Sequence, residues 1–330
     1  MPPIGSAVTR RGFVLTVTGA ALVACAPTGS TQHADARVRA HDPEPTADRR
    51  SAAIAVAGAT IELVVDGDPS LPFASFEAWA RRSAQWIADY FGGDLPVPSL
   101  ELTILASGGG TVGFGSHRDG RWIDIRCGRR TSERSLDTDW TMVHEMLHAC
   151  FPDLSSRHRW MQEGLSTYLE PIVRARAGNI THERVWERWT ASMPYGRPRP
   201  GDRGLDRTHT WGRTYWGGAV FWLVADLRLR QATEHTKSLR DVMRHLASIG
   251  ATGRVDWSTK QVLAEAEKAT GSTAITDVYA ELALAPGDVD LDALFADLGV
   301  VRDDEGHVTF DERAPLAALR RSITHREADA

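Results

Sequence analysis

The sequence has little cysteine, no basic block and no apolar run long enough to cross a membrane. Three cysteines in 330 residues exclude a disulfide-rich scaffold. Arginine is spread along the whole chain and the formal net charge is −5, which argues against a nucleic-acid partner. With 42% hydrophobic and 25% charged residues, the composition is that of a globular protein with enough apolar material for a sizeable core.

The first 25 residues resemble a bacterial export signal. Paired arginines in 9-TRRGFVL-15 lead into the apolar run 12-GFVLTVTGAALVA-24, which is shorter than the roughly 20 residues of a membrane span and resembles a twin-arginine signal. The run ends in 22-LVAC-25, which resembles a lipobox, so Cys25 would become the lipidated N-terminus. We therefore expect an exported protein, lipid-anchored at the outer face of the bacterial cell membrane; a plain secretory signal with an incidental cysteine is the alternative.

The signal comprises residues 1–24, and the composition of the chain divides the remainder into three segments. Residues 25–50 are rich in Pro, Thr, Ala, Asp and Arg without apolar periodicity, which predicts a disordered tether. Residues 51–134 predict a mixed α and β lobe and residues 135–330 a mainly helical lobe, the two forming one unit. In an exported protein, Cys127 and Cys150 would be in an oxidising compartment. We expect either a disulfide between them or two buried thiols.

Hydrophobic periodicity places the elements of this α+β fold. Strands are expected over 54–65 (a strand or hairpin), 100–106 and 121–127, with a helix over 73–91 and a glycine-rich turn or irregular edge over 108–115. Further helices are expected over 136–150, 158–177, 181–192, 213–231, 236–248, 258–270, 274–284 and 290–298. A small late hairpin is expected over 299–310, and residues 194–204 predict a loop near the active cleft.

The stretch 144-HEMLH-148 carries the clearest chemical signal. Positions four apart lie one helical turn above each other, so His144 and His148 point the same way and can hold one metal ion. Glu145 sits one step round the helix, where it can reach a water on that metal without being a ligand.

A site with two histidines needs a third ligand and an open fourth position. Glu163 is the candidate, because the turn at 151–157 lets a second helix fold back on the first. Gly164 beside it would let backbones approach closely. Taken singly, histidines at helical spacing or a lone glutamate are more often ordinary surface or core residues; the combined pattern favours a Zn²⁺ site.

The motifs 144-HEMLH-148 and 160-WMQEGLSTY-168 together resemble the gluzincin metallopeptidases, whose third zinc ligand is the Glu of an E-G motif on the next helix. The block 213-RTYWGGAVFWLVADLRLR-230 resembles the glycyl aminopeptidase-like family, with Asp226 and Arg230 at the expected ending. The resemblance implies a thermolysin-like zinc peptidase fold, with a small N-terminal sheet lobe and a helical C-terminal lobe. It also implies that Tyr215 stabilises the oxyanion, with His209 as the alternative donor.

Peptidases of this kind hold substrate along an edge strand, and 107-SGGGTVGFGSH-117 occupies the corresponding place, so Gly113, Phe114 and Gly115 are the expected substrate-binding residues. This stretch lacks the acidic residue that binds a free amine in the family's aminopeptidases, although Asp119 or Glu133 could substitute. An endopeptidase or a hydrolase of a non-peptide bond fits equally well. The acceptors that orient the histidine ligands would be among Asp139, Asp153 and Glu170.

The sequence therefore predicts an exported zinc metallopeptidase that acts on a peptide or protein. Glu145 would be the general base of a zinc-activated water. Two alternatives stay open: a catalytically silent lipoprotein of the same fold that serves as a binding or assembly factor, and a metal-free helical lipoprotein with a chance motif. The sequence does not indicate the oligomeric state.

Overall fold

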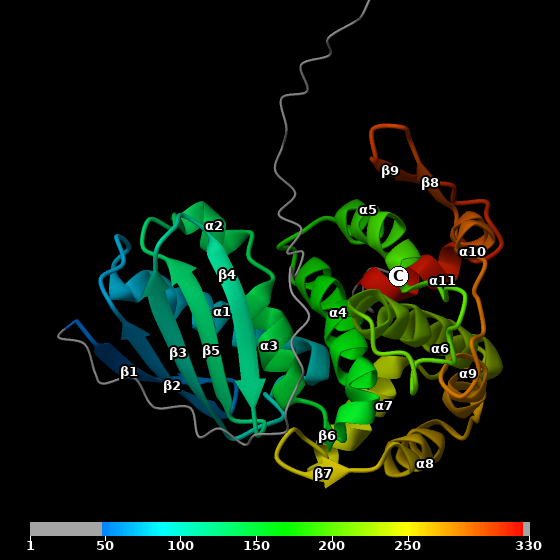
Figure 1. The fold of residues 1–330 in the computed structure, drawn as a ribbon, viewed down its shortest axis with the longest axis horizontal. Helices are drawn as coiled ribbons and strands as arrows, with labels where there is room; N and C mark the ends of the chain where they lie inside the picture. The colour runs from blue at the N-terminus through cyan, green and yellow to red at the C-terminus, as the bar shows by residue number, and fades with distance from the viewer. Residues whose placement is uncertain (1–47, 326–330) are drawn as a thin grey trace, which may run out of the picture. The chain divides into compact units, whose positions relative to one another are not determined.

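Five strands form a mixed sheet in the computed structural model, which describes residues 48–325 (Figure 1). The signal peptide, Cys25 and most of the expected tether lie outside the described residues. The sheet order is β1-β2-β3-β5-β4, with β2, β3 and β5 parallel and both outer strands antiparallel to their neighbours. The strands are Arg50–Val56 (β1), Ala59–Asp66 (β2), Ser99–Ser107 (β3), Val112–Arg118 (β4) and Trp122–Gly128 (β5).

One face of the sheet is covered by helices α1 (Phe73–Phe91) and α3 (Thr141–Ala149), as Figure 1 shows. Alternate residues of β3 (Leu100, Leu102 and Ile104) are fully buried beneath them. Their neighbours in sequence are only half-buried, which is the pattern of a sheet with one solvated face. The sheet thus supports α3 from below and leaves β4 as an open edge beside it.

Helix α4 (Arg159–Arg176) is the centre of the helical part and contacts α1, α3, α5, α6 and α11. Helix α6 (Gly218–Ala232) is buried on nearly every side, as a helix in the middle of a core must be. The remaining helices are Glu133–Asp137 (α2), His182–Ser192 (α5), Leu239–Ser248 (α7), Thr259–Thr270 (α8), Ala274–Leu282 (α9), Leu291–Asp297 (α10) and Ala317–Thr324 (α11).

Short elements connect these helices. A π-helical turn precedes α6 directly. Two residues of β6 pair in parallel with β7, and β8 and β9 form a hairpin. These elements are Asp153–Leu154 (β6), Ser156–His158 (η1), Met193–Gly196 (η2), Arg213–Gly217 (η3, π-helical), Asp256–Trp257 (β7), Val300–Arg302 (β8) and Val308–Phe310 (β9).

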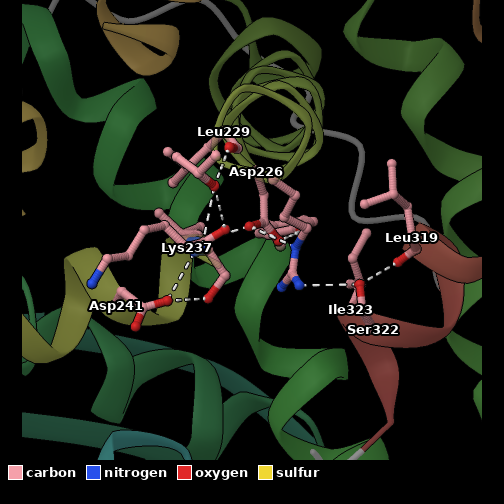
Figure 2. Close-up of polar contacts among 12 residues, drawn as sticks. Asp226, Leu229, Lys237, Asp241, Leu319, Ser322 and Ile323 are labelled. Carbon is pink, nitrogen blue, oxygen red and sulfur yellow. Dashed lines mark hydrogen bonds and ion pairs between the residues drawn. The ribbon is translucent and has the colours of Figure 1, made fainter. Parts of the chain in front are cut away.

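A buried polar cluster ties α6 to its neighbours (Figure 2). The carboxylate of Asp226 accepts hydrogen bonds from the Tyr168 hydroxyl (3.0 Å), Arg230 Nε (3.1 Å) and the main-chain N–H of Leu239 (2.7 Å). Arg230 also donates to Ser322 Oγ at 3.0 Å. Elements α4, α6 and α7 therefore meet at one satisfied carboxylate, and α11 joins the cluster through Arg230.

The α+β fold agrees with the expectation from sequence, and most expected elements lie within a few residues of their observed bounds. The single helix expected over 136–150 is wrong, because residues 138–140 separate α2 from α3. Asp139 lies in this gap, and its Oδ2 accepts the N–H of Met142 in the first turn of α3 at 3.0 Å. Helix α11 was not expected. The glycine-rich stretch runs into strand β4 from Val112 onward, and the expected irregular edge is seen as a bulge between Val112 and Gly115.

Two further findings concern the cysteines and the membrane. Cys127 and Cys150 are buried free thiols, so the second of the two alternatives for this pair holds. Each Sγ lies near a main-chain carbonyl, that of Gly128 (3.8 Å) and that of Met146 (3.4 Å) respectively. Across residues 48–325, no helix has the length and apolar character of a membrane span.

Candidate metal centre

His144 and His148 lie one turn apart on α3 and face Glu163 on α4. Oε2 of Glu163 is 3.3 Å from His144 Nε2 and 3.2 Å from His148 Nε2. All three side chains are buried, and their ligand atoms lie within 4.8 Å of one another. The structure thus brings together the three residues that the sequence predicts as ligands.

A close contact between helices sets the position of α4. A Cβ atom on Gly164 would lie 2.4 Å from the Gly218 Cα of α6, and one on Gly218 would lie 2.3 Å from the Trp160 carbonyl oxygen. Only a pair of glycines permits this approach. Gln162 adds a side-chain hydrogen bond to Asp153 Oδ1 at 3.0 Å, so the residue before Glu163 is also held.

The three donors fit a zinc ion. Tetrahedral ligand atoms about 2.0–2.2 Å from one Zn²⁺ are separated by about 3.3–3.6 Å, close to the 3.2 and 3.3 Å observed here. The other oxygen of Glu163, Oε1, accepts a hydrogen bond from Arg159 Nε at 3.2 Å. Arg159 therefore leaves Oε2 as the oxygen that faces both imidazoles.

The acids considered as acceptors for the histidine ligands bond elsewhere. Asp139 accepts from Met142, as described above, and Asp153 from Gln162. Glu170 accepts from Arg174 and Arg188. His144 Nδ1 and His148 Nδ1 are buried without a hydrogen-bond partner among the described residues.

The charges of the cluster suit metal binding. Burial disfavours the charged carboxylate of Glu163, but the two histidines outweigh it and hold the pKa well below its usual range. Burial, with the nearby charge of His117, lowers the pKa of His148 to about 4, so this imidazole is neutral at pH 7. Burial opposes protonation of His144 as well, yet its hydrogen bond with Glu163 and the neighbouring carboxylates raise its pKa. A bound cation would replace that proton.

Glu145 lies beside the cluster and contacts β4. Its side chain is largely buried, and its Oε2 is 3.5 Å from His117 Nδ1. Burial raises the pKa of Glu145, but the lowering effect of His117 and of the two histidines of α3 is larger. The pKa is therefore below its usual value, and the carboxylate is ionised at neutral pH. A Cβ atom on Gly115 would lie 2.6 Å from Glu145 Cγ, so only glycine leaves room for the carboxylate there.

His117 is a site residue that sequence reasoning missed. Its ring stacks on that of His148, with centroids 3.8 Å apart and planes 13° apart. It lies two positions after Gly115 on β4 and so shares the strand face that meets α3. The alternation of a strand could have revealed this, but the glycine-rich stretch was expected to be irregular.

Tyr215 lies in the π-helical turn η3, half-buried beside His144. The two ring centroids are 6.4 Å apart. Burial, reinforced by the charge of Glu163, raises the pKa of Tyr215 to about 12, so the phenol keeps its proton at neutral pH. The other expected donor, His209, is exposed and belongs to none of the potential metal-binding groups found among the described residues.

The remaining predicted residues surround β4. Gly113 and Phe114 are exposed on this edge strand, and Phe114 keeps 73% of its surface accessible. Asp119 lies in the turn between β4 and β5 with a φ of 50°, at the far end of the strand from Gly113. Glu133 accepts a hydrogen bond from Ser75, so its carboxylate is already engaged.

No protein-family model matches the sequence, and no curated protein matches it. Among solved structures, an aminopeptidase N family protein from Idiomarina loihiensis superimposes with a TM-score of 0.61 at 17% identity, covering 81% of this chain and 53% of that chain. An M1 zinc metallopeptidase from Deinococcus radiodurans matches with a TM-score of 0.47 at 18% identity, covering 73% of this chain and 54% of its own. A variant of that enzyme bound to a Tyr-Ser-Ala substrate gives 0.48 at 17%, covering 73% and 52%.

The chain thus spans about half the length of the Idiomarina protein, 53% of it. A likeness at this level of identity shows a shared fold. The structural neighbours of the chain are aminopeptidase N and M1 zinc metallopeptidases.

Proposed function

We propose that this protein is a zinc-dependent metallopeptidase. The observation that carries the proposal is the approach of His144, His148 and Glu163 to one point, with an ionised Glu145 beside it. A purely structural zinc site has no use for a carboxylate next to the metal's open position. The fold shared with an aminopeptidase N family protein supports the same conclusion.

In this proposal, His144 Nε2, His148 Nε2 and Glu163 Oε2 hold Zn²⁺. The ion would polarise the substrate carbonyl and lower the pKa of a water molecule to about 7. Arg159 contributes by keeping the second oxygen of Glu163 occupied. Residues 51–134 would form the small sheet lobe of a thermolysin-like fold, and residues 135–330 the helical lobe that binds the zinc ion.

The chain's own groups move the protons. Glu145 accepts a proton from the attacking water and later delivers it to the departing amine, so it acts first as base and then as acid. His117 holds Glu145 Oε2 at 3.5 Å. The protonated phenol of Tyr215 donates a hydrogen bond to the oxygen on which negative charge develops. The substrate backbone lies along β4 at Gly113, Phe114 and Gly115, where its main-chain groups complete the sheet edge.

The test measures bound zinc and peptide hydrolysis together. Glu145→Gln is expected to retain zinc while hydrolysis of a peptide library falls by about 10²-fold or more, and Glu163→Ala is expected to lose the metal. Glu62→Gln, an exposed glutamate of β2 that belongs to none of the potential metal-binding groups, is the control and should behave as the wild type. A wild-type protein that holds zinc but cleaves nothing would instead favour the binding or assembly factor.

We also propose that the protein acts outside the cytoplasm, anchored to the membrane through a lipid on Cys25. The arginine pair and the lipobox-like 22-LVAC-25 support this location. Cys25→Ala should move the protein from the membrane fraction to the soluble fraction of the cells. An unchanged distribution would refute the anchor and leave the proposed chemistry untouched.

A further inference from the structure

Three aromatic side chains are exposed beside the candidate metal centre. They belong to the seven large apolar side chains that are exposed in the described part of the chain: Trp140 keeps 44% of its surface accessible, and Tyr195 and Trp211 keep 57% each. Large aromatic rings contribute strongly to binding when they become buried. Their exposure here therefore calls for a partner.

These rings form a continuous strip that passes the proposed zinc ligand His144. The ring of Trp140 meets His144 edge-on at a centroid distance of 5.4 Å. His144 also lies 6.4 Å from Tyr215, which lies 6.1 Å from Trp211, and Trp211 lies 6.1 Å from Tyr195. The exposed rings are thus linked to the centre through ring contacts with His144 and Tyr215.

Close backbone contacts hold the Tyr195 and Trp211 side of the strip. A Cβ atom on Gly212 would lie 2.2 Å from the Tyr195 carbonyl oxygen, and one on Gly196 would lie 2.3 Å from the main-chain nitrogen of Gly217. Elements η2 and η3 can pack this closely only because both positions are glycine. The two rings are consequently preorganised in the absence of a ligand.

Arg188 lies against the Trp140 end of the strip. Its guanidinium lies 5.1 Å from the Trp140 ring centroid and 5.8 Å from that of the buried Trp216. The same group pairs with the buried carboxylate of Glu170, which also pairs with Arg174. The Trp140 ring is therefore held from behind by a guanidinium that is itself anchored in the core.

We propose that Trp140, Tyr195 and Trp211 form the subsite that selects an apolar, preferably aromatic, side chain of the peptide substrate. The inference rests on the proposed peptidase function. A substrate held along β4 at Glu145 would bring the residues next to its scissile bond over these rings. Stacking and burial of an apolar side chain would then discriminate between peptides that share one backbone.

The experiment compares peptides that differ in a single residue, phenylalanine or alanine, at each position near the cleaved bond. The wild type is expected to show a higher kcat/KM for phenylalanine at one position. Trp211→Ala should reduce that ratio by about tenfold or more, whereas Trp211→Phe should keep most of it. Leu284→Ala removes an exposed apolar side chain from outside the strip and should leave the ratio unchanged.

A second readout is independent of turnover. In the Glu145→Gln background, the Kd for the phenylalanine peptide should rise about tenfold when Trp211→Ala is added, with bound zinc unchanged. If Trp211→Ala cleaves peptides with the same phenylalanine preference as the wild type and binds them with the same Kd, the subsite proposal is wrong. The proposed peptidase function would be unaffected by that result. A wild-type protein that cleaves no peptide would overturn both.

Discussion

At the residue scale, removing the hydroxyl of Tyr215 tests whether this side chain has a chemical role or only a structural one. It lies 6.4 Å ring to ring from His144 in a π-helical turn, and such turns often occur at functional sites. Its pKa of about 12 keeps it a hydrogen-bond donor. We expect Tyr215→Phe to lower kcat by roughly 10²-fold, because one oxyanion donor is lost.

The measurement for Tyr215→Phe is steady-state hydrolysis together with bound zinc and the midpoint of thermal unfolding. The half-buried ring remains in the variant, so zinc content and unfolding should match the wild type. An unchanged kcat would assign the oxyanion role elsewhere.

At the scale of elements, the close contact between α4 and α6 fixes the position of Glu163 in the candidate metal centre. Alanine is favoured over glycine in a helix by about 1 kcal/mol. At Gly164, however, the added Cβ would lie 2.4 Å from Gly218 Cα, and such overpacking costs about 3 kcal/mol. Gly164→Ala should therefore lower the free energy of unfolding by about 2 kcal/mol and weaken zinc binding, because the helices must separate.

Urea unfolding of the metal-free protein and a zinc titration measure the two effects. Gly108→Ala is the matched control, since a Cβ atom there meets no other group within 4 Å. If Gly164→Ala is as stable as this control, the helix contact does not set the site.

At the scale of the whole molecule, the Asp226 cluster joins the C-terminal helix to the core (Figure 2). Its removal would leave the buried guanidinium of Arg230 without its carboxylate. Because an uncompensated buried charge is costly, Asp226→Ala should lower the free energy of unfolding by about 3–5 kcal/mol. Urea unfolding gives the value.

An exposed ion pair between α6 and α9 provides the comparison. Arg228 donates to both oxygens of Glu281, and their side chains are 42% and 51% exposed. Glu281→Ala should therefore cost less than about 1 kcal/mol. Similar losses for the two variants would contradict the structural role of the Asp226 cluster.

Local periodicity is the part of the fold that the sequence determined by itself. Apolar spacing predicts α1 within a residue and a strand or hairpin where β1 and β2 lie. The four-residue spacing of His144 and His148 places both on one helical face. These features depend on neighbours along the chain, so the sequence contains the information they need. The E-G pair of Glu163 and Gly164 added the third ligand by resemblance to known peptidases.

Contacts between distant segments were decided only by the tertiary structure. His117 and the aromatic strip join the site because β4 packs against α3, η3 against α4 and η2 against η3, at glycines whose role no local pattern reveals. The free thiols of Cys127 and Cys150 likewise depend on how the sheet meets α3. The physical reason is that periodicity fixes which face a residue occupies, whereas the distance to a partner from another element depends on how closely two backbones can approach.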